Sequence, residues 1–189
     1  MFKYAIFGLF AWLGYGFIAQ NQAMQDMRHS MAIIQNSKVD ETAELVLVKD
    51  RHPVSYTKRD LECLARNIFF EAGTEDTAGK YAVAQVTINR VKTGNWGKNI
   101  CAVVYSPDQF SWTKEKELAT SKLDSSNWHE SRAIAHAVLG QGLRVKTLSK
   151  ALFYHADYAN PPWNDNQKAV AKIGHHIFYT KAKGSWVSL

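Results

Sequence analysis

The sequence lacks the short motifs that mark several large classes of enzyme. Its 189 residues contain no Gly-rich phosphate loop, no H-E-x-x-H pair and no paired C-x-x-C motif. These absences weaken the case for a nucleotide-binding enzyme and for a zinc site, because both depend on such spacings. Only two cysteines occur, no internal repeat is visible, and 21% of the residues are charged. This composition excludes a disordered, collagenous or low-complexity chain and is typical of a globular protein.

The excess of positive charge lies in the C-terminal two thirds of the chain. Residues 1–56 hold five basic and five acidic side chains, whereas residues 57–189 hold 18 basic and 12 acidic ones, which accounts for the net charge of +6. A basic domain is typical of proteins that bind nucleic acid, an anionic membrane or an acidic wall polymer. The basic residues form no recognisable nucleic-acid-binding motif, so we expect no nucleic acid partner.

The N-terminus carries a long uncharged stretch. Lys3 precedes 22 uncharged residues, of which residues 4–19 are strongly apolar. As a helix these would span roughly 24 Å, slightly less than the ~30 Å hydrocarbon core of a bilayer. The stretch suits a cleaved signal peptide or an uncleaved anchor. We favour the anchor, because Phe17 lies at the −3 position before Ala19, where cleavage requires a small residue.

The chain is predicted to contain three parts and one folded domain. We expect a hydrophobic signal-anchor at residues 1–22, a linker or stalk at 23–56, and a domain at 57–189 that is long enough for one core. Apolar spacing and capping residues predict the elements of this domain. Helices are expected at about 57–72, 76–91, 99–105 and 126–139, and short strands at 151–155 and 176–180. This list predicts a mostly helical α+β fold.

Glu71 is the most informative polar residue of the predicted domain. It closes the first helix directly after three apolar residues, 68–70. Burial beside aromatic rings and the negative end of the helix dipole both disfavour the charged carboxylate, so we expect its pKa to be raised. Such a group suits a general acid, and a surface glutamate at a frayed helix end is the alternative. Glu75 offers a second carboxylate for glycoside chemistry, whereas Asp76 is better explained as an acidic residue that favours the next helix N-terminus.

Cys63 and Cys101 are the two cysteines of the chain. In an exported domain, a pair of cysteines favours one disulfide, here between the Glu71 helix and the short helix near residue 100. Two buried free thiols, or a thiol nucleophile paired with His155 or His175, are the alternatives. Cys63 falls on the buried face of an amphipathic helix, which argues against an exposed thiolate.

Aromatic residues with polar neighbours form a second group of candidates. Phe110, Trp112, Tyr154 and Trp163 lie in predicted loops or strand ends that are rich in Gln, Ser, Asn and Pro. Aromatic rings in such surroundings suit stacking against sugar rings, and packing in the core is the alternative.

Seven segments together resemble the SleB-type cell wall hydrolase family. They follow one another in matching order and spacing over about residues 58–180, at 64–72, 79–91, 100–105, 109–112, 151–156, 162–163 and 173–179. One departure is visible. The family often has Arg-Gly between its catalytic Glu-Ala or Glu-Ser and the next Glu, whereas this chain reads Glu71-Ala-Gly-Thr-Glu75 and lacks that arginine.

The resemblance implies a small, lysozyme-like catalytic domain that acts on peptidoglycan outside the cytoplasm. It implies lytic transglycosylase chemistry with one catalytic glutamate, which corresponds to Glu71, and no metal or organic cofactor. The candidates for lining a glycan groove are Glu75, Gln109, Phe110, Trp112, Tyr154, His155 and Trp163. The alternatives are a hydrolytic muramidase that uses the same glutamate, a peptidoglycan amidase or peptidase that uses cysteine or zinc, and an inactive wall-binding module.

Overall fold

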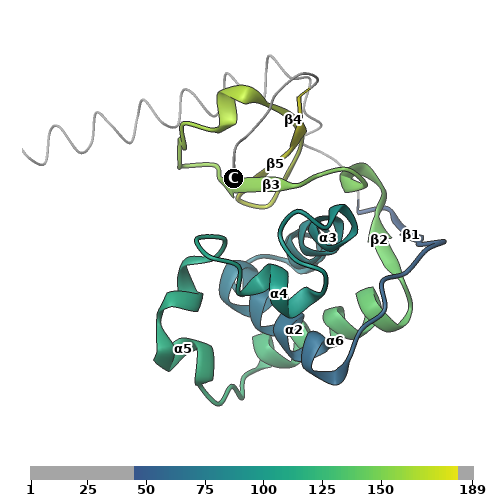
Figure 1. Cartoon of the computed structure of the whole chain (residues 1–189), viewed down its shortest axis with the longest axis vertical. Helices are drawn as coiled ribbons and strands as arrows, with labels where there is room; N and C mark the ends of the chain where they lie inside the picture. Colours follow the sequence, from purple (N-terminus) through teal and green to yellow (C-terminus); the bar gives the residue numbers. More distant parts are fainter. Residues whose placement is uncertain (1–44, 183–189) are drawn as a thin grey trace, which may run out of the picture.

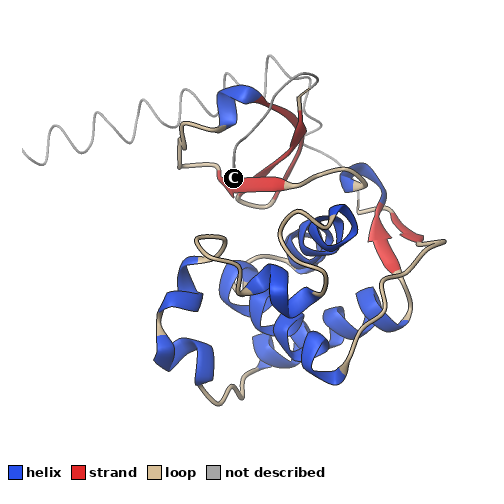
Figure 2. Cartoon of the chain, viewed as in Figure 1, coloured by secondary structure: helices blue, strands red, loops and turns tan. Residues whose placement is uncertain are grey.

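The computed structural model describes residues 45–182 of the chain. Within them, a body of helices lies beside a small three-stranded sheet, with a two-stranded ribbon at one side (Figures 1 and 2). The mostly helical α+β prediction is therefore confirmed. The predicted anchor at residues 4–19 and most of the predicted linker lie outside the described residues. Among the helices of residues 45–182, none combines the length and apolar character that crossing a bilayer requires.

Helix α2 (Lys58–Ala72) ends at the residue that the sequence predicts and begins directly after its predicted capping residue, Thr57. Thr57 and Asp60 form a reciprocal capping box, in which the Thr57 hydroxyl accepts from the Asp60 N–H at 3.1 Å and the Asp60 carboxylate accepts from the Thr57 N–H at 3.0 Å. The helix ends before Gly73. Its inward face is apolar, and this face places the last turn of α2, with Glu71, against the rest of the domain.

Helix α3 (Thr77–Thr93) is the central element of the domain. Asp76 caps its N-terminus by accepting from the Gly79 N–H at 2.8 Å, and Gly94, with φ +74°, ends it. The cap agrees with the structural interpretation of Asp76, and αL geometry explains the glycine. Residues from nearly every side of α3 are buried, because it contacts α2, α4 and α6 on one side and strands on the other.

The remaining helices complete the larger apolar cluster. They are α4 (Ile100–Val104), α5 (Lys116–Thr120) and α6 (Ser126–Gly140), together with the 3₁₀ segment η1 (Ser111–Lys114). Two further 3₁₀ segments lie outside this cluster: η2 (Lys146–Leu148), whose Leu148 belongs to a second cluster, and η3 (Asn164–Asn166). Cys63 of α2 and Cys101 of α4 form a disulfide with their Cα atoms 5.3 Å apart. The favoured pairing of the two cysteines is thus confirmed.

The sheet contains β3 (Phe153–Ala156), β4 (Gln167–Ile173) and β5 (His176–Lys181) in the antiparallel order β3–β5–β4. The sequence pattern did not predict strand β4. Its inward residues are Ala169, Ala171 and Ile173, and two of these are alanines, which carry a weak β signal although they alternate correctly. Phe178 of β5 joins β4 to α3 in a second apolar cluster.

The linker prediction is wrong for its last residues. Strand β1 (Leu47–Lys49) pairs antiparallel with β2 (Leu143–Val145), so this part of the chain belongs to the domain. Leu47 packs on the second apolar cluster, whereas Val46 and Val48 are exposed. Because apolar residues occupy both faces of this short strand, the alternation that reveals an amphipathic strand is hidden in the sequence.

Candidate active site

The carboxyl group of Glu71 lies between the end of α2 and strand β3. Its Oε2 atom accepts a hydrogen bond from the Tyr154 hydroxyl at 3.0 Å, although the two residues are 83 positions apart in the chain. Both side chains are half-buried. The last turn of α2 holds no basic residue that would neutralise the negative end of the helix dipole.

The electrostatic surroundings of Glu71 favour its neutral form. Burial raises the pKa of Glu71 above its usual value, and this effect exceeds the opposing effects of the Tyr154 hydrogen bond and the Arg90 charge. The structure therefore confirms the direction expected from the sequence. Burial and the Glu71 charge raise the pKa of Tyr154 well above its usual value, so this phenol stays protonated and donates.

Arg90 of α3 is a neighbour of Glu71 that the sequence analysis did not single out. Its Nε atom donates to the Leu152 carbonyl at 2.9 Å, and its guanidinium lies 5.4 Å from the Trp96 ring centroid and 5.5 Å from that of Phe110. Only 6% of the residue is exposed, and its Nη1 atom has no hydrogen-bond partner among residues 45–182. An arginine within a largely apolar helix segment is the signal that could have identified it.

Glu75 lies beside the turn between β4 and β5. Its Oε2 atom accepts from the His175 N–H at 3.1 Å, and its Oε1 atom is 3.8 Å from Nδ1 of His176. Its side chain is 7% exposed, and a Cβ at Gly174 would collide with it. His176 in turn packs edge-on against the Tyr154 ring, with centroids 5.2 Å apart. Glu75 therefore supports the strand segment behind Tyr154 and does not lie at the surface as an open second carboxylate.

Three of the residues predicted to line a glycan groove are buried, which argues against stacking of Phe110 and Trp112 on sugar rings and against an open position for His155. Phe110, Trp112 and His155 are 3%, 4% and 7% exposed. Trp112 stacks on Phe70 at 4.7 Å, and Nε2 of His155 lies 2.7 Å from the Tyr179 hydroxyl. Their ring faces contact protein because the surrounding helices and strands close over them, so core packing is the correct interpretation.

Two further candidates for lining the groove, Trp163 and Gln109, lie in different surroundings. Trp163 is half-buried among Phe153, His155 and Tyr179 at the outer part of the sheet. Gln109 is half-buried, and its amide donates to the Pro107 carbonyl at 3.3 Å. Of the predicted groove set, Tyr154 is the residue that the structure places in contact with Glu71.

Comparison with known proteins identifies a shared domain. A family model described as Cell Wall Hydrolase matches residues 74–179, a range that includes Glu75 and begins three positions after Glu71. The spore cortex-lytic enzyme of Halalkalibacterium halodurans is 25% identical over 126 residues, which cover 67% of this chain and 36% of that protein. The spore cortex-lytic enzyme of Bacillus subtilis is 22% identical over 144 residues, which cover 76% of this chain and 45% of that protein. The chain thus spans less than half the length of these curated relatives.

Solved structures share the fold. The catalytic domain of the germination-specific lytic transglycosylase SleB from Bacillus anthracis has a TM-score of 0.55 at 24% identity, covering 68% of this chain and 100% of that one. The catalytic domain of the Bacillus cereus SleB protein has a TM-score of 0.54 at 23% identity, covering 70% of this chain and 98% of that one. Since the family match covers more than half of the 189 residues, this chain belongs to the SleB-type cell wall hydrolase family.

Proposed function

We propose that this protein cleaves the glycan strands of peptidoglycan as a lytic transglycosylase, with Glu71 as its general acid and base. The observation that carries the proposal is the half-buried Glu71 carboxyl group, whose pKa is raised by burial and whose Oε2 accepts from Tyr154. A neutral carboxyl group near neutral pH can give a proton to a leaving group, which an exposed glutamate rarely does.

One carboxyl group is sufficient for this reaction. Neutral Glu71 gives its proton to the glycosidic oxygen between a muramic acid unit and a glucosamine unit, and the bond from the anomeric carbon to that oxygen breaks. The Glu71 carboxylate then takes the proton of the C6 hydroxyl of the same muramoyl residue, and this oxygen bonds to the anomeric carbon. The product is a 1,6-anhydro ring, no water is consumed, and Glu71 returns to its neutral form.

Tyr154 and Arg90 have distinct roles in this proposal. When Glu71 is ionised between the two steps, the Tyr154 hydroxyl donates to it and the buried Arg90 charge attracts it. Both interactions stabilise the short-lived carboxylate, while burial keeps the resting group neutral. Glu75 is a positioning residue, because its contacts are with the turn that carries His175 and His176.

The disulfide argues against the thiol alternative. Cys63 and Cys101 are bonded to each other, and a disulfide sulfur is no thiolate nucleophile. A disulfide also fits a domain that acts outside the cytoplasm, where such bonds persist. We include in the proposal that residues 4–19 hold the domain at the membrane facing the wall. Mass spectrometry of the mature N-terminus tests this point, and a chain that begins beyond residue 19 would contradict it.

Digestion of purified peptidoglycan tests the reaction. Fragments that end in 1,6-anhydromuramic acid, identified by mass spectrometry, are the expected products. Reducing muramic ends would indicate hydrolysis by the same glutamate. Released stem peptides with intact glycan would indicate an amidase or peptidase, and binding without any release would indicate a wall-binding module.

Replacement of Tyr154 by phenylalanine is expected to shift the pH dependence of cleavage. Loss of the hydroxyl removes a hydrogen bond that favours the carboxylate, so the pKa of Glu71 rises further. The decline in cleavage rate on the alkaline side should therefore begin at a higher pH than in the unmodified protein. Fragment release measured across pH checks this, with Tyr158→Phe, which alters an exposed ring, as the control. A decline in cleavage rate that begins at the same pH as in the unmodified protein, or at a lower pH, would contradict the role of the Tyr154 hydroxyl beside Glu71.

A further inference from the structure

A cavity lies between the β1–β2 ribbon and helix α3, away from Glu71. Its volume is about 410 Å³, which is within the range of small-ligand sites. Gln85, Asn89 and Lys92 line it from one face of α3. Arg90, which interacts electrostatically with Glu71, follows Asn89 by about 100° around the same helix and therefore lies on another face. One rigid helix thus separates the two sites.

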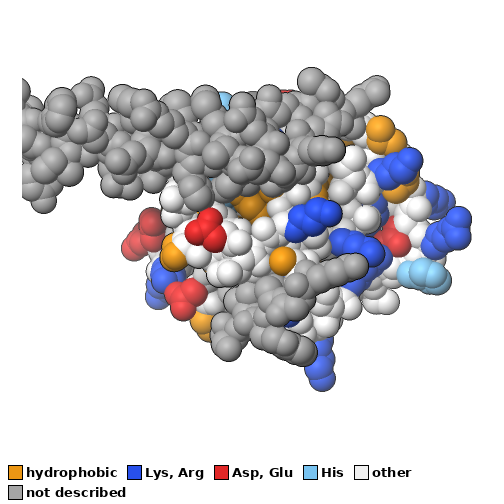
Figure 3. Space-filling model, turned by 90° about the horizontal axis from the view of Figure 1, so that it is seen from above, with side chains coloured by type: hydrophobic (Ala, Val, Ile, Leu, Met, Phe, Trp, Pro, Cys, Tyr) orange, Lys and Arg blue, Asp and Glu red, His pale blue; other side chains and the backbone are white. Residues whose placement is uncertain are grey.

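The lining of this cavity is strongly basic. Five basic residues and one acidic residue, Asp50, are among those that line it, and the five are Lys49, Arg51, Lys92, Arg144 and Lys146. Figure 3 shows Lys and Arg side chains gathered on the side of the molecule where β1 and β2 lie in Figure 1. Charges of one sign around a concavity attract ligands of the opposite sign.

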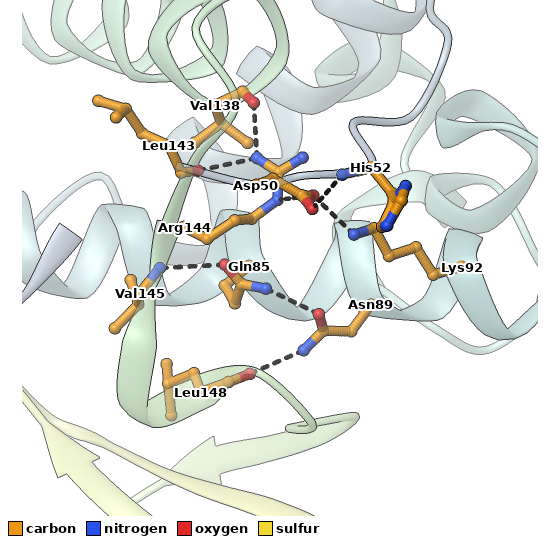
Figure 4. A network of polar contacts seen from close by, with 10 residues as sticks. All are labelled: Asp50, His52, Gln85, Asn89, Lys92, Val138, Leu143, Arg144, Val145 and Leu148. Atoms are coloured by element: carbon orange, nitrogen blue, oxygen red, sulfur yellow. Dashed lines mark hydrogen bonds and ion pairs between the residues drawn. The ribbon is translucent and has the colours of Figure 1, made fainter. Parts of the chain in front are cut away.

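A network of hydrogen bonds and ion pairs, partly buried, holds the floor of the cavity in place (Figure 4). Asp50 accepts from Arg144 Nε at 3.0 Å and from Lys92 Nζ at 2.6 Å. The amides of Gln85 and Asn89 bond to each other at 2.7 Å, and Asn89 also donates to the Leu148 carbonyl at 2.8 Å. These partners fix the side chains before any ligand arrives, which lowers the entropic cost of binding.

The network leaves positive charge uncompensated. Asp50 is shared by Lys92 and Arg144, so one carboxylate faces two cations. Arg144 is 5% exposed, lines the cavity, and its Nη2 atom has no hydrogen-bond partner among residues 45–182. Lys49, Arg51 and Lys146 are exposed at the rim and form no ion pair with other described residues.

From this geometry we infer that the cavity binds carboxylate groups of the peptides that branch from the glycan strand. The inference rests on the proposed function for its choice of ligand. A glycan held at Glu71 carries its peptide branches along with it, and a branch long enough to pass around α3 would bring its carboxylates to the cavity at a high effective concentration. The guanidinium groups of Arg51 and Arg144 provide the paired donors that carboxylates accept, and the lysines at the rim add positive charge. The site would therefore direct the enzyme to glycan that still bears peptides.

Binding is best measured in an inactive background, so that cleavage does not change the polymer. The Glu71→Gln chain carries either Lys49→Gln, Arg51→Gln and Lys146→Gln together, or the control set Lys58→Gln, Arg59→Gln and Lys122→Gln. Both sets remove three exposed basic side chains, and the control residues do not line the cavity. Each protein is sedimented with intact peptidoglycan and with glycan strands from which an amidase has removed the peptides.

We expect the three substitutions at the cavity to raise the dissociation constant for intact peptidoglycan about tenfold. Each exposed ion pair that is lost changes a binding constant by a factor of about 1.5 to 5. The same set should leave binding to peptide-free glycan unchanged, and the control set should affect both polymers equally and weakly. Soluble stem peptides released by the amidase should compete with intact peptidoglycan, whereas inorganic phosphate at the same ionic strength should not. Matching thermal unfolding curves check that all variants fold.

Three results would overturn the inference. The first is an equal loss of binding to both polymers, and the second is a loss of binding no larger than that caused by the control substitutions. The third is competition by phosphate as strong as competition by the stem peptides. The assay needs no catalysis, so it separates this inference from the proposed function. If binding depends on the peptides but the unmodified protein releases no fragments, the carboxylate site is supported and the proposed function is rejected. If the unmodified protein releases fragments but binding does not depend on the peptides, the proposed function is supported and the carboxylate site is rejected.

Discussion

Replacement of Glu71 by glutamine is expected to reduce the release of glycan fragments by at least about 10³-fold, since one group carries both proton transfers. Glutamine has nearly the same shape as glutamate, can still accept from the Tyr154 hydroxyl, and cannot exchange a proton. The rate of fragment release from purified peptidoglycan measures the effect. Glu62→Gln, on an earlier turn of α2 where the carboxylate pairs with Arg66 at the surface, is the matched control and should retain activity.

The same substitution should leave the folded state intact or make it more stable at neutral pH. The pKa of Glu71 is raised on folding, so its contribution to stability is complete below the unfolded pKa and is lost as pH rises through the folded pKa. Glutamine stays neutral at every pH and avoids this loss. Unfolding by urea at pH 4 and pH 7 checks the sign, and the variant should gain relative to the unmodified protein at the higher pH.

Two results would contradict the role of Glu71. Retained cleavage by Glu71→Gln would show that another group supplies the proton. A large loss of stability at pH 7 would show that the ionised carboxylate supports the fold, as an ordinary surface or capping glutamate does. Together the two measurements separate a catalytic group from a structural one, because active-site groups are often held in surroundings that disfavour them.

Replacement of both Cys63 and Cys101 by serine is expected to lower the free energy of unfolding by about 3–4 kcal/mol. The bond closes a loop with a sequence separation of 38 and joins α2 to α4. Without it, the unfolded chain gains conformational freedom, while the packing around both helices is almost unchanged. Urea unfolding of the double variant measures the loss, and unmodified protein unfolded in the presence of a reductant serves as a second comparison.

The double serine variant also tests the thiol alternative. At a temperature where it remains folded, it should still release glycan fragments, because the disulfide joins α2 to α4, whereas the hydrogen bond of Glu71 joins the last turn of α2 to Tyr154 of β3. Loss of cleavage by a folded double variant would revive a cysteine nucleophile. A change in unfolding free energy below about 1 kcal/mol would mean that the disulfide adds little to this domain, against the chain-entropy argument.

Helices α2, α3 and α6 were predictable because their N-terminal ends depend on local hydrogen bonds, whereas α5, which has no side-chain cap, was not predicted. Thr57 with Asp60, Asp76 with Gly79, and Ser125 with Trp128 are each three positions apart, and each side chain caps the helix that follows it. A sequence displays such short-range partners directly. The strands were harder to predict. The exposed valines in and just before β1 and the small inward alanines of β4 both weaken the alternation that marks a strand.

Part of the candidate site could likewise be predicted from the sequence, and part could not. The sequence alone determined that Glu71 ends a helix beside apolar residues, that two cysteines are available to pair, and that the basic charge belongs to the domain. The tertiary structure decided that Tyr154 and Arg90 are the partners of Glu71, that Phe110 and Trp112 are buried, and that β1 closes a basic cavity. These outcomes depend on residues tens of positions apart, whose packing follows from the fold as a whole and has no local sequence signal.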